Sequence, residues 1–226
     1  MTAPLLLVTG TGTGIGKTVV SAGLVAAWAR RGVVVAGVKP IESGVEPAGP
    51  PSGDVRELGR VSTFHVTRFP PPYLLADPVS PHLAARRAGR SIDLDVIRDW
   101  LAPIRAQADA TVVELPGGLF SPLTDTLTNA DLLASLAPSR VVLVAPDRLG
   151  VIHDVIATTR AARGAGITFH GLVLSASGAS DASVGTNAAE LARVLPSLPV
   201  VASLPRAGAD ELGPHFDAAL AALVPA

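Results

Sequence analysis

Apolar and polar positions follow two alternating patterns along this chain of 226 residues. Short runs rich in Val, Leu and Ile are continuously apolar, as expected for strands that are buried on both faces of a sheet. These runs cover residues 4–9, 32–38, 110–115, 140–145, 170–175 and 198–204. Longer Ala- and Leu-rich segments between and after them predict helices over residues 17–30, 93–107, 151–164, 184–195 and 209–223.

The alternation of strands and helices predicts the fold class. Successive strand–helix–strand units favour a parallel sheet that is covered by helices on both sides. We therefore expect an α/β protein with three αβα layers and a mostly parallel central sheet of about six to seven strands. The chain has no linker, repeat or low-complexity tract, and its length suits one large domain, so residues 1–226 are interpreted as a single domain.

Residues 44–82 depart from this rhythm because they are rich in proline and resemble a long loop. A loop of this length in a compact domain is more often functional than idle. Ligands of open α/β sheets bind beyond the carboxyl ends of the strands. The segments that follow strands are therefore where chemistry is expected, and they are 10–16, 39–54, 114–125 and 146–152.

The first apolar run leads into a glycine-rich loop, GTGTGIGKT, at residues 10–18. A strand, a glycine loop and a helix that begins at Lys17 point backbone N–H groups and a helix N-terminus at phosphate. Lys17 would reach the β- and γ-phosphates of ATP, and the Thr18 hydroxyl would bind Mg²⁺. The loop has five residues between Gly10 and Gly16, one more than the Walker A pattern, and it does not fit the dinucleotide fingerprint. The residues expected at the nucleotide are Gly12, Thr13, Gly14, Ile15, Gly16, Lys17 and Thr18.

Two acidic residues are candidates for the Mg²⁺ site. Glu114 closes an apolar strand, as the acid of a Walker B segment does, and is expected to bind the metal ion directly or through water. Asp54 lies in the long loop or at the start of a short helix. From the residues alone, two interpretations of Asp54 are balanced: it binds Mg²⁺, or it stabilises a helix N-terminus for which Ser52 is the N-cap.

The chain has 16 arginines but only two lysines, Lys17 and Lys39. A compact ammonium and a planar guanidinium are not interchangeable, so we expect both lysines to be functional. Lys39 follows the second apolar run, where it would stabilise charge on a transferred γ-phosphoryl group. Ser43 offers a hydroxyl nearby, and Gly117 offers a backbone N–H to an anion.

Composition and charge narrow the possible partners. A formal net charge of −1 leaves no basic excess for nucleic acid or for anionic membranes. The chain has no cysteine, which excludes thiol catalysis and thiolate metal sites. No apolar run approaches the roughly 18 residues that span a bilayer, so a soluble cytoplasmic protein is expected. The five histidines show no metal-ligand spacing, and only His153 is kept as a candidate.

Together these motifs resemble one enzyme family, the dethiobiotin synthetases. The resemblance rests on VTGTGTGIGKT, KPIESG, SPHLAA, VELPGGLFSPLTDTLTNAD and LGVIHD, in that order from about Val8 to Gly171, and it is weak beyond. The family's phosphate loop has the same extra residue. The resemblance implies that 7,8-diaminononanoate, CO₂ and MgATP are converted to dethiobiotin, ADP and phosphate through a carbamate and a carbamic–phosphoric anhydride.

The resemblance also assigns roles position by position. It implies that Lys17 and Lys39 contact the phosphates and the carbamate, and that Thr18, Asp54 and Glu114 hold Mg²⁺. It favours the metal-binding interpretation of Asp54. The residues that it places around the diamine and carbamate, besides Lys39, are Thr13, Ser43 and Gly117.

Members of this family are homodimers in which the substrate tail and its carboxylate reach the partner subunit. The resemblance implies that the matching segment here is Gly150, Val151, Ile152 and His153. The family usually has an asparagine where this chain has His153. It also has an acid in place of Gly14, and glycine and alanine in place of Leu115-Pro116.

Two further departures lie at the nucleobase end of the expected nucleotide site. Ser175 stands where the family has an asparagine that reads adenine. Ser203 stands where an acid is often found. We therefore expect Ser175 and Ser203 to contact the base and nucleotide selectivity to be loose.

Three other functions remain open at this stage. A ParA/MinD-like ATPase switch would carry a signature lysine where this chain has Gly12, and it would need a basic face or an amphipathic tail. An ATP-dependent amide ligase of cobalamin synthesis would ordinarily bring a glutaminase domain with a catalytic cysteine. A degenerate paralogue would bind nucleotide without catalysis, and Leu115-Pro116 and His153 are the grounds for that alternative.

Overall fold

The computed structural model describes residues 3–50, 53–176, 181–206 and 213–223. Its central element is a six-stranded sheet in which every neighbouring pair of strands is parallel. In spatial order the strands are β2 (Val35–Val38), β5 (Ala110–Glu114), β1 (Leu5–Gly10), β6 (Arg140–Pro146), β7 (Gly171–Ser175) and β8 (Val200–Leu204). From β1 the chain runs to one side for β2 and β5 and to the other side for β6, β7 and β8. Such a switch point is where open α/β sheets form their binding crevice.

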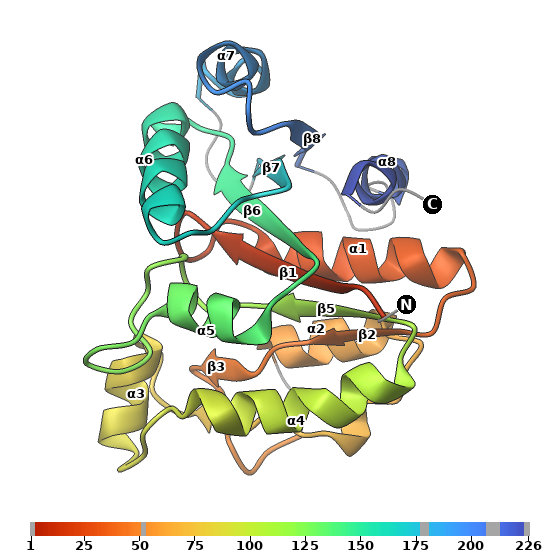
Figure 1. Ribbon diagram of the computed structural model, residues 1–226, viewed down its shortest axis with the longest axis vertical. Coiled ribbons are helices and arrows are strands. Elements are labelled where there is room, and N and C mark those ends of the chain that lie inside the picture. The colour runs from red at the N-terminus through yellow and green to blue at the C-terminus, as the bar shows by residue number, and fades with distance from the viewer. Residues whose placement is uncertain (1–2, 51–52, 177–180, 207–212, 224–226) are drawn as a thin grey trace.

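Helices cover both faces of the sheet (Figure 1). One face carries α1 (Lys17–Arg30), α2 (Gly53–Val61) and α8 (Gly213–Leu223), with α1 packed against both of the others. The opposite face carries α4 (Leu94–Gln107), α5 (Asn129–Leu136), α6 (Val151–Gly164) and α7 (Asn187–Val194). The expectation of three αβα layers around a mostly parallel sheet is confirmed.

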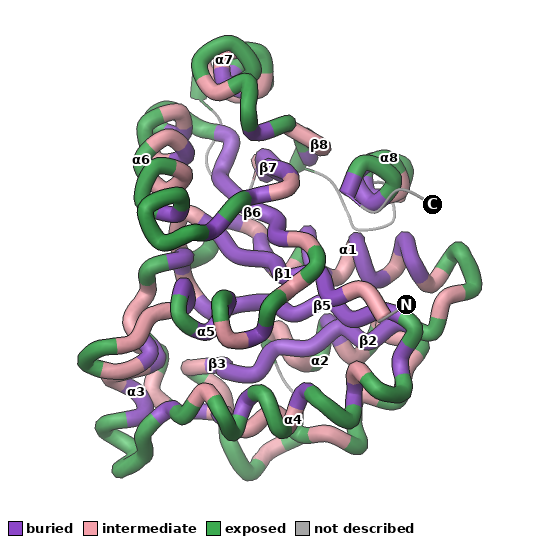
Figure 2. The backbone as a smooth tube through the Cα atoms, viewed as in Figure 1, coloured by how far each residue is buried: buried purple, intermediate pink, exposed green. Residues whose placement is uncertain are grey.

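The central strand β1 explains why the apolar runs are continuous. Leu5 and Leu7 pack into the core beneath α4, α5 and α6, whereas Leu6 and Val8 pack into the core beneath α1 and α8. Successive side chains of a strand point to opposite faces, so a sheet with two covered faces needs apolar residues at every position. Figure 2 shows β1 and its neighbouring strands as the buried centre of the molecule.

The region at 44–82 is more structured than expected. It holds α2, a short 3₁₀ helix η1 (Val66–Arg68) and strand β4 (Tyr73–Leu75), which pairs in parallel with β3 (Ile41–Ser43). Helix α3 (Pro81–Arg87) follows and packs against this small sheet. The expectation of a loop was wrong for β4, because a strand of three residues is too short to produce a readable apolar period. A short helix beginning near Asp54 was one of the two expected alternatives, and α2 is that helix.

The remaining expected elements agree with the structure within three residues at each described end. A capping box opens α5, because the side chains of Thr128 and Asp131 each form a hydrogen bond with the backbone of the other residue. The start of the last expected helix, at residues 209–212, lies outside the described residues. Among the residues that are described, no helix combines the length and the apolarity required to cross a membrane.

Candidate active site

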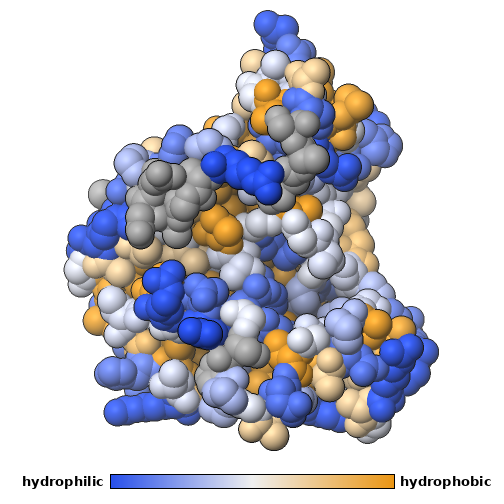
Figure 3. Space-filling view, turned by 180° about the vertical axis from the view of Figure 1, so that it is seen from behind, coloured by the Kyte–Doolittle hydropathy of each residue, from blue (hydrophilic) through white to orange (hydrophobic). Residues whose placement is uncertain are grey.

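A cavity of about 620 Å³ lies at the carboxyl ends of β1, β2 and β5. Its walls come from the glycine loop, the loop after β2, the start of α2 and the loop after β5. Figure 3 shows the outline of the molecule indented at the edge toward which the strands of Figure 1 point. The expected residues that line the cavity are Thr13, Gly14, Ile15, Gly16, Lys17, Thr18, Lys39, Ser43, Asp54, Glu114 and Gly117. Three of the four expected loops therefore meet in one place.

The glycine loop has the backbone of an anion-binding turn. Gly14 and Gly16 have φ angles of 70° and 89°, a region in which side chains other than hydrogen are strained. Gly16 is the N-cap of α1, so the first N–H groups of that helix open toward the cavity. Lys17 is 6 % exposed, and its Nζ donates to the Gly12 carbonyl at 2.7 Å. Burial lowers the pKa of Lys17 to about 8, although the charge of Glu114 opposes the shift.

Strand register brings Lys39 and Glu114 together. Val38 pairs with Val113, so Lys39, directly after β2, lies beside Glu114 at the end of β5. Lys39 Nζ donates a hydrogen bond to Glu114 Oε1 at 2.8 Å. Val8 of β1 pairs with Glu114, which places this carboxylate beneath the glycine loop, where Thr18 Oγ1 donates to Glu114 Oε1 at 3.1 Å.

The second carboxylate of this cluster comes from α2. Asp54 lies in the first turn of the helix and accepts a hydrogen bond from Lys39. Burial alone would lower the pKa of Lys39, but the charges of Glu114 and Asp54 outweigh it and raise that pKa above its usual value. Burial disfavours the ionised form of Asp54, yet Lys39 holds the pKa of Asp54 below its usual value. The cluster therefore places the ammonium of Lys39 between the side chains of Asp54 and Glu114.

These residues fit a Mg²⁺ ion that is shared with phosphate. Glu114 is fully buried, and its Oε2 has no hydrogen-bond partner within the described part of the chain. Thr18 and Asp54 line the same cavity and could provide further oxygen ligands. No group of three or more His, Cys, Asp or Glu side chains among the described residues could hold a metal by itself. Mg²⁺ typically takes one or two carboxylates and fills its other positions with phosphate oxygens and water, so this donor set suits it.

The loop after β5 is fastened to the glycine loop. Leu119 N donates to the Gly10 carbonyl at 3.0 Å, and a Cβ atom at Gly118 would meet the backbone of residues 10–12. Asn129 is fully buried and donates to the carbonyls of Pro116 and Gly118, the latter at 2.8 Å. The backbone N–H groups of this loop are thus held at a fixed distance from the phosphate site.

Sequence reasoning missed Glu42, Ser121 and Asn129. Glu42 and Ser121 line the cavity, and Asn129 supports it from behind. Burial raises the pKa of Glu42 above its usual value. A glutamate three residues after Lys39, within the segment 39–54 where chemistry was expected, was a usable signal for Glu42. The partners of Asn129, by contrast, lie on a loop more than ten residues away in sequence.

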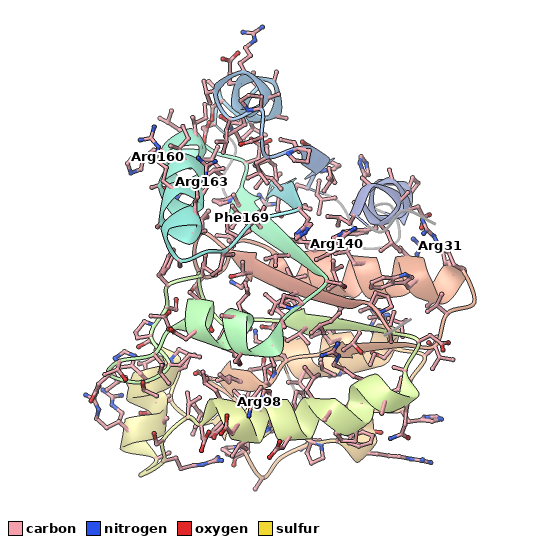
Figure 4. All side chains as sticks on the ribbon, viewed as in Figure 1. Arg31, Arg98, Arg140, Arg160, Arg163 and Phe169 are labelled. Carbon is pink, nitrogen blue, oxygen red and sulfur yellow. The ribbon has the colours of Figure 1, made fainter. Side chains whose placement is uncertain are left out.

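The expectation that the two lysines are special is supported by their burial, since Lys17 and Lys39 are each only 6 % exposed. Arginines, by contrast, lie mainly at the periphery of the molecule. Figure 4 labels Arg31, Arg98, Arg160 and Arg163, all of which are exposed.

Seven expected site residues do not line this cavity. Gly12 lies in the glycine loop, where its carbonyl accepts a hydrogen bond from Lys17 Nζ. Ser175 ends β7, and Ser203 lies on the adjacent strand β8, where it pairs with Leu174. Gly150, Val151, Ile152 and His153 form the start of α6, with Gly150 as its N-cap. The strands of Ser175 and Ser203 lie on the other side of β1, beyond β6 in the sheet order, and α6 follows β6 in the chain.

The parallel αβα sheet, the glycine loop with Lys17 and Thr18, and the acid that ends the neighbouring strand define a nucleotide-binding protein of the P-loop NTPase class. A family model described as "AAA domain" matches residues 5–209. In fold, the chain is similar to chloroplast FtsY from Physcomitrella patens, with a TM-score of 0.57, 17 % identity and coverage of 97 % of this chain and 65 % of that one.

Curated relatives define the family more closely. The chain is 40 % identical to the ATP-dependent dethiobiotin synthetase BioD of Ralstonia nicotianae over 94 % of each protein. It is 41 % identical to the ATP-dependent dethiobiotin synthetase BioD of Nitrosospira multiformis over 74 % of this chain and 73 % of that protein. The chain belongs to the ATP-dependent dethiobiotin synthetase family, as its motifs suggested.

Proposed function

We propose that the protein is an ATP-dependent dethiobiotin synthetase that converts 7,8-diaminononanoate, CO₂ and ATP into dethiobiotin, ADP and phosphate. The observation that carries the proposal is the gathering of Lys17, Thr18, Lys39, Asp54 and Glu114 in one cavity beside the phosphate loop. The family relationship supports the assignment of this cluster as the machinery of a ligase that forms C–N bonds. We also propose that the chain works as one domain and acts in the cytoplasm.

The reaction needs no nucleophile from the protein. One amine of the substrate attacks CO₂ and loses a proton, which gives a carbamate. A carbamate oxygen attacks the γ-phosphorus, and ADP leaves. The second amine attacks the carbonyl carbon of the resulting anhydride, phosphate leaves with the electron pair, and a further proton is lost as the ureido ring closes. Catalysis then rests on positioning and on charge stabilisation.

The two lysines divide the charge stabilisation between them. Lys17 rises from the first turn of α1 beneath the glycine loop, where its ammonium would hold the phosphates of ATP. Lys39 lies across the cavity between Asp54 and Glu114, where its ammonium would contact the carbamate and the γ-phosphoryl group. Mg²⁺, held by Thr18, Asp54 and Glu114, would neutralise charge on the β- and γ-phosphates.

The rest of the substrate site comes from three segments, namely the glycine loop, β3 and the loop after β5. Thr13, Ser43 and Gly117 line the cavity and would bind the diamine and carbamate. Ser43 Oγ is buried without a hydrogen-bond partner among the described residues, so it is available to a ligand.

We propose that the protein acts as a homodimer in which Gly150, Val151, Ile152 and His153 of the partner subunit bind the substrate tail. In support, Leu149 directly before this segment is 75 % exposed, and Phe120 in the loop after β5 is 41 % exposed. Contiguous exposed apolar surface marks protein–protein contacts, and these two side chains would contribute to such a surface in the dimer.

Dethiobiotin formation tests the proposal directly. The protein is incubated with diaminononanoate, ¹³C-bicarbonate and MgATP, and products are separated by mass. We expect dethiobiotin that carries the label in its ureido carbon, together with ADP in equal amount and only when the diamine is present. Phosphate release that is independent of the diamine, without dethiobiotin, would support an ATPase switch instead. Nucleotide binding without any turnover would support the degenerate paralogue.

A further inference from the structure

Glu42 is a buried carboxylate in the wall of the catalytic cavity that the motif analysis left without a role. It lies in the middle of β3, only 5 % exposed, three residues after Lys39. Both of its oxygens accept hydrogen bonds from the backbone. Oε1 accepts from Asp54 N at 2.7 Å, and Oε2 accepts from Val55 N at 3.1 Å.

These two bonds cap helix α2 from a distance in sequence. The first N–H groups of a helix have no partner within the helix, and a negative charge at this end also interacts favourably with the helix dipole. The N-cap expected from the sequence, Ser52, lies outside the described residues. Glu42 satisfies two first-turn donors with one side chain, and it does so from a different element of the fold.

Gly53 shows independently that the backbone is shaped around this carboxylate. Gly53 has a φ angle of +56°, which side chains rarely adopt. A Cβ atom at this position would stand 2.3 Å from Glu42 Oε1. The glycine therefore provides both the turn that starts α2 and the space that the carboxylate occupies.

The first turn that Glu42 holds is the one that carries Asp54. Asp54 accepts a hydrogen bond from Lys39, and Lys39 also bonds Glu114. We propose that Glu42 is a positioning residue that fixes Asp54 relative to Lys39 and Glu114 and thereby sets the Mg²⁺ affinity of the nucleotide site. The inference rests on the proposed function, in which Asp54 helps to hold the metal ion.

The test compares Glu42→Gln with the unaltered protein. Glutamine keeps the size of the side chain but leaves one acceptor and places an NH₂ group against a backbone N–H. We expect the Mg²⁺ concentration for half-maximal dethiobiotin formation to rise about tenfold, the effect expected for one lost charge-assisted hydrogen bond. Calorimetric titration of the ADP complex with Mg²⁺ should show the same shift without turnover. Hydrogen exchange should quicken in peptides that cover residues 53–58.

Two further variants separate positioning from general stability. Gly53→Ala disturbs the same contact from the helix side, so its Mg²⁺ affinity should fall in the same way. Asp93→Asn is the matched control, since Asp93 caps α4 by accepting from Asp95 N at 2.8 Å outside the cavity. Its Mg²⁺ dependence should equal that of the unaltered protein.

The outcomes distinguish the inference from the function on which it rests. Unchanged Mg²⁺ affinity in Glu42→Gln and Gly53→Ala would overturn the inference, and so would a lower melting temperature without a change in Mg²⁺ affinity. If Asp54→Asn shifts the Mg²⁺ titration and Glu42→Gln does not, only the role of Glu42 fails. If Asp54→Asn has no effect either, the metal-binding role of Asp54 fails first. The calorimetric arm remains valid even if no dethiobiotin is formed.

Discussion

Lys39 Nζ lies 2.8 Å from Glu114 Oε1 where β2 and β5 end side by side, and both side chains are buried. Asp54 approaches the same ammonium from α2. A buried cation is stable only when it is paired and hydrogen-bonded, and this pairing holds Lys39 charged and oriented. The same geometry limits which residue can replace Lys39, because its compact ammonium is surrounded by two carboxylates and a wall of the cavity.

Replacement of Lys39 by arginine tests this requirement. The variant keeps the charge but puts a planar, longer group between Asp54 and Glu114. We expect dethiobiotin formation to fall by about 100-fold or more, as when one preorganised donor is removed from a transition state. Nucleotide binding, followed by calorimetry, should change only a few-fold because Lys17 still holds the phosphates. A rate close to normal would show that lysine is not specifically needed.

An exposed position supplies the control for that exchange. Arg60 lies on α2 and pairs with Glu57 at 3.2 Å, with its side chain 60 % exposed. Arg60→Lys is the reverse substitution at a solvent-exposed position, where an ion pair contributes about 0–1 kcal/mol. Its rate and stability should match those of the unaltered protein.

The pH dependence of nucleotide binding should report on Lys17. Burial lowers the pKa of Lys17 to about 8, so the free protein loses this charge as the pH rises through that value. Bound phosphate favours the charged form and raises the pKa again. Nucleotide affinity should therefore be constant below about pH 7 and decrease above about pH 8. Near pH 8.5, Lys17 should take up a proton when the nucleotide binds.

Calorimetry in buffers of different ionisation enthalpy measures that proton directly. Lys17→Met should bind nucleotide more weakly at every pH and should take up no proton. Proton uptake of equal size in Lys17→Met would assign the effect to another group.

The sequence was informative wherever a signal is local. The glycine loop, Lys39 and Glu114 follow predicted strands, and the rule that ligands bind at the carboxyl ends of parallel strands was enough to bring them together. Strand bounds were predictable because both faces of the sheet are covered, so that Leu5 to Val8 of β1 are apolar without interruption.

Contacts between distant segments could not be predicted in the same way. Glu42 and Asn129 act on backbone groups 11 or more residues away in the chain, and their partners are set by how β3, α2 and the loop after β5 pack. Strands β3 and β4 were not predicted because each has three residues, which is too few for an apolar period. Proline-rich composition then favoured a loop over 44–82 where tertiary packing supports strands and helices.

The distance between the phosphate loop and the loop after β5 should depend on Gly118. A Cβ atom there would stand 3.2 Å from the Gly10 carbonyl and 3.3 Å from Gly12 N, both of which are backbone atoms that yield little. Gly118→Ala should therefore push the two loops apart and weaken ATP binding about tenfold, a loss of about 1.4 kcal/mol.

Gly164 provides the control, because it ends α6 with nothing within 4 Å of its Cβ position. Gly164→Ala should leave binding unchanged and add about 0.5–1 kcal/mol of stability, and equal ATP affinity in both variants would contradict the prediction.

Loose nucleotide selectivity is expected from the two serines at the ends of β7 and β8. Ser175 is 6 % exposed at the end of β7. Ser203 of β8 pairs with Leu174, the residue directly before Ser175. A hydroxyl both donates and accepts, so it rejects neither adenine nor guanine, whereas an asparagine can bond adenine in two places. We expect kcat/KM for GTP and CTP to lie within about 100-fold of the value for ATP, since larger ratios need buried groups that are left unpaired by the wrong base.

Ser175→Asn should increase the preference for ATP over GTP by about tenfold, equivalent to about 1.4 kcal/mol, whereas Ser203→Ala should leave the ratio unchanged. Competition assays with mixed nucleotides measure these ratios directly, and a preference for ATP of several hundredfold in the unaltered protein would show that other groups read the base.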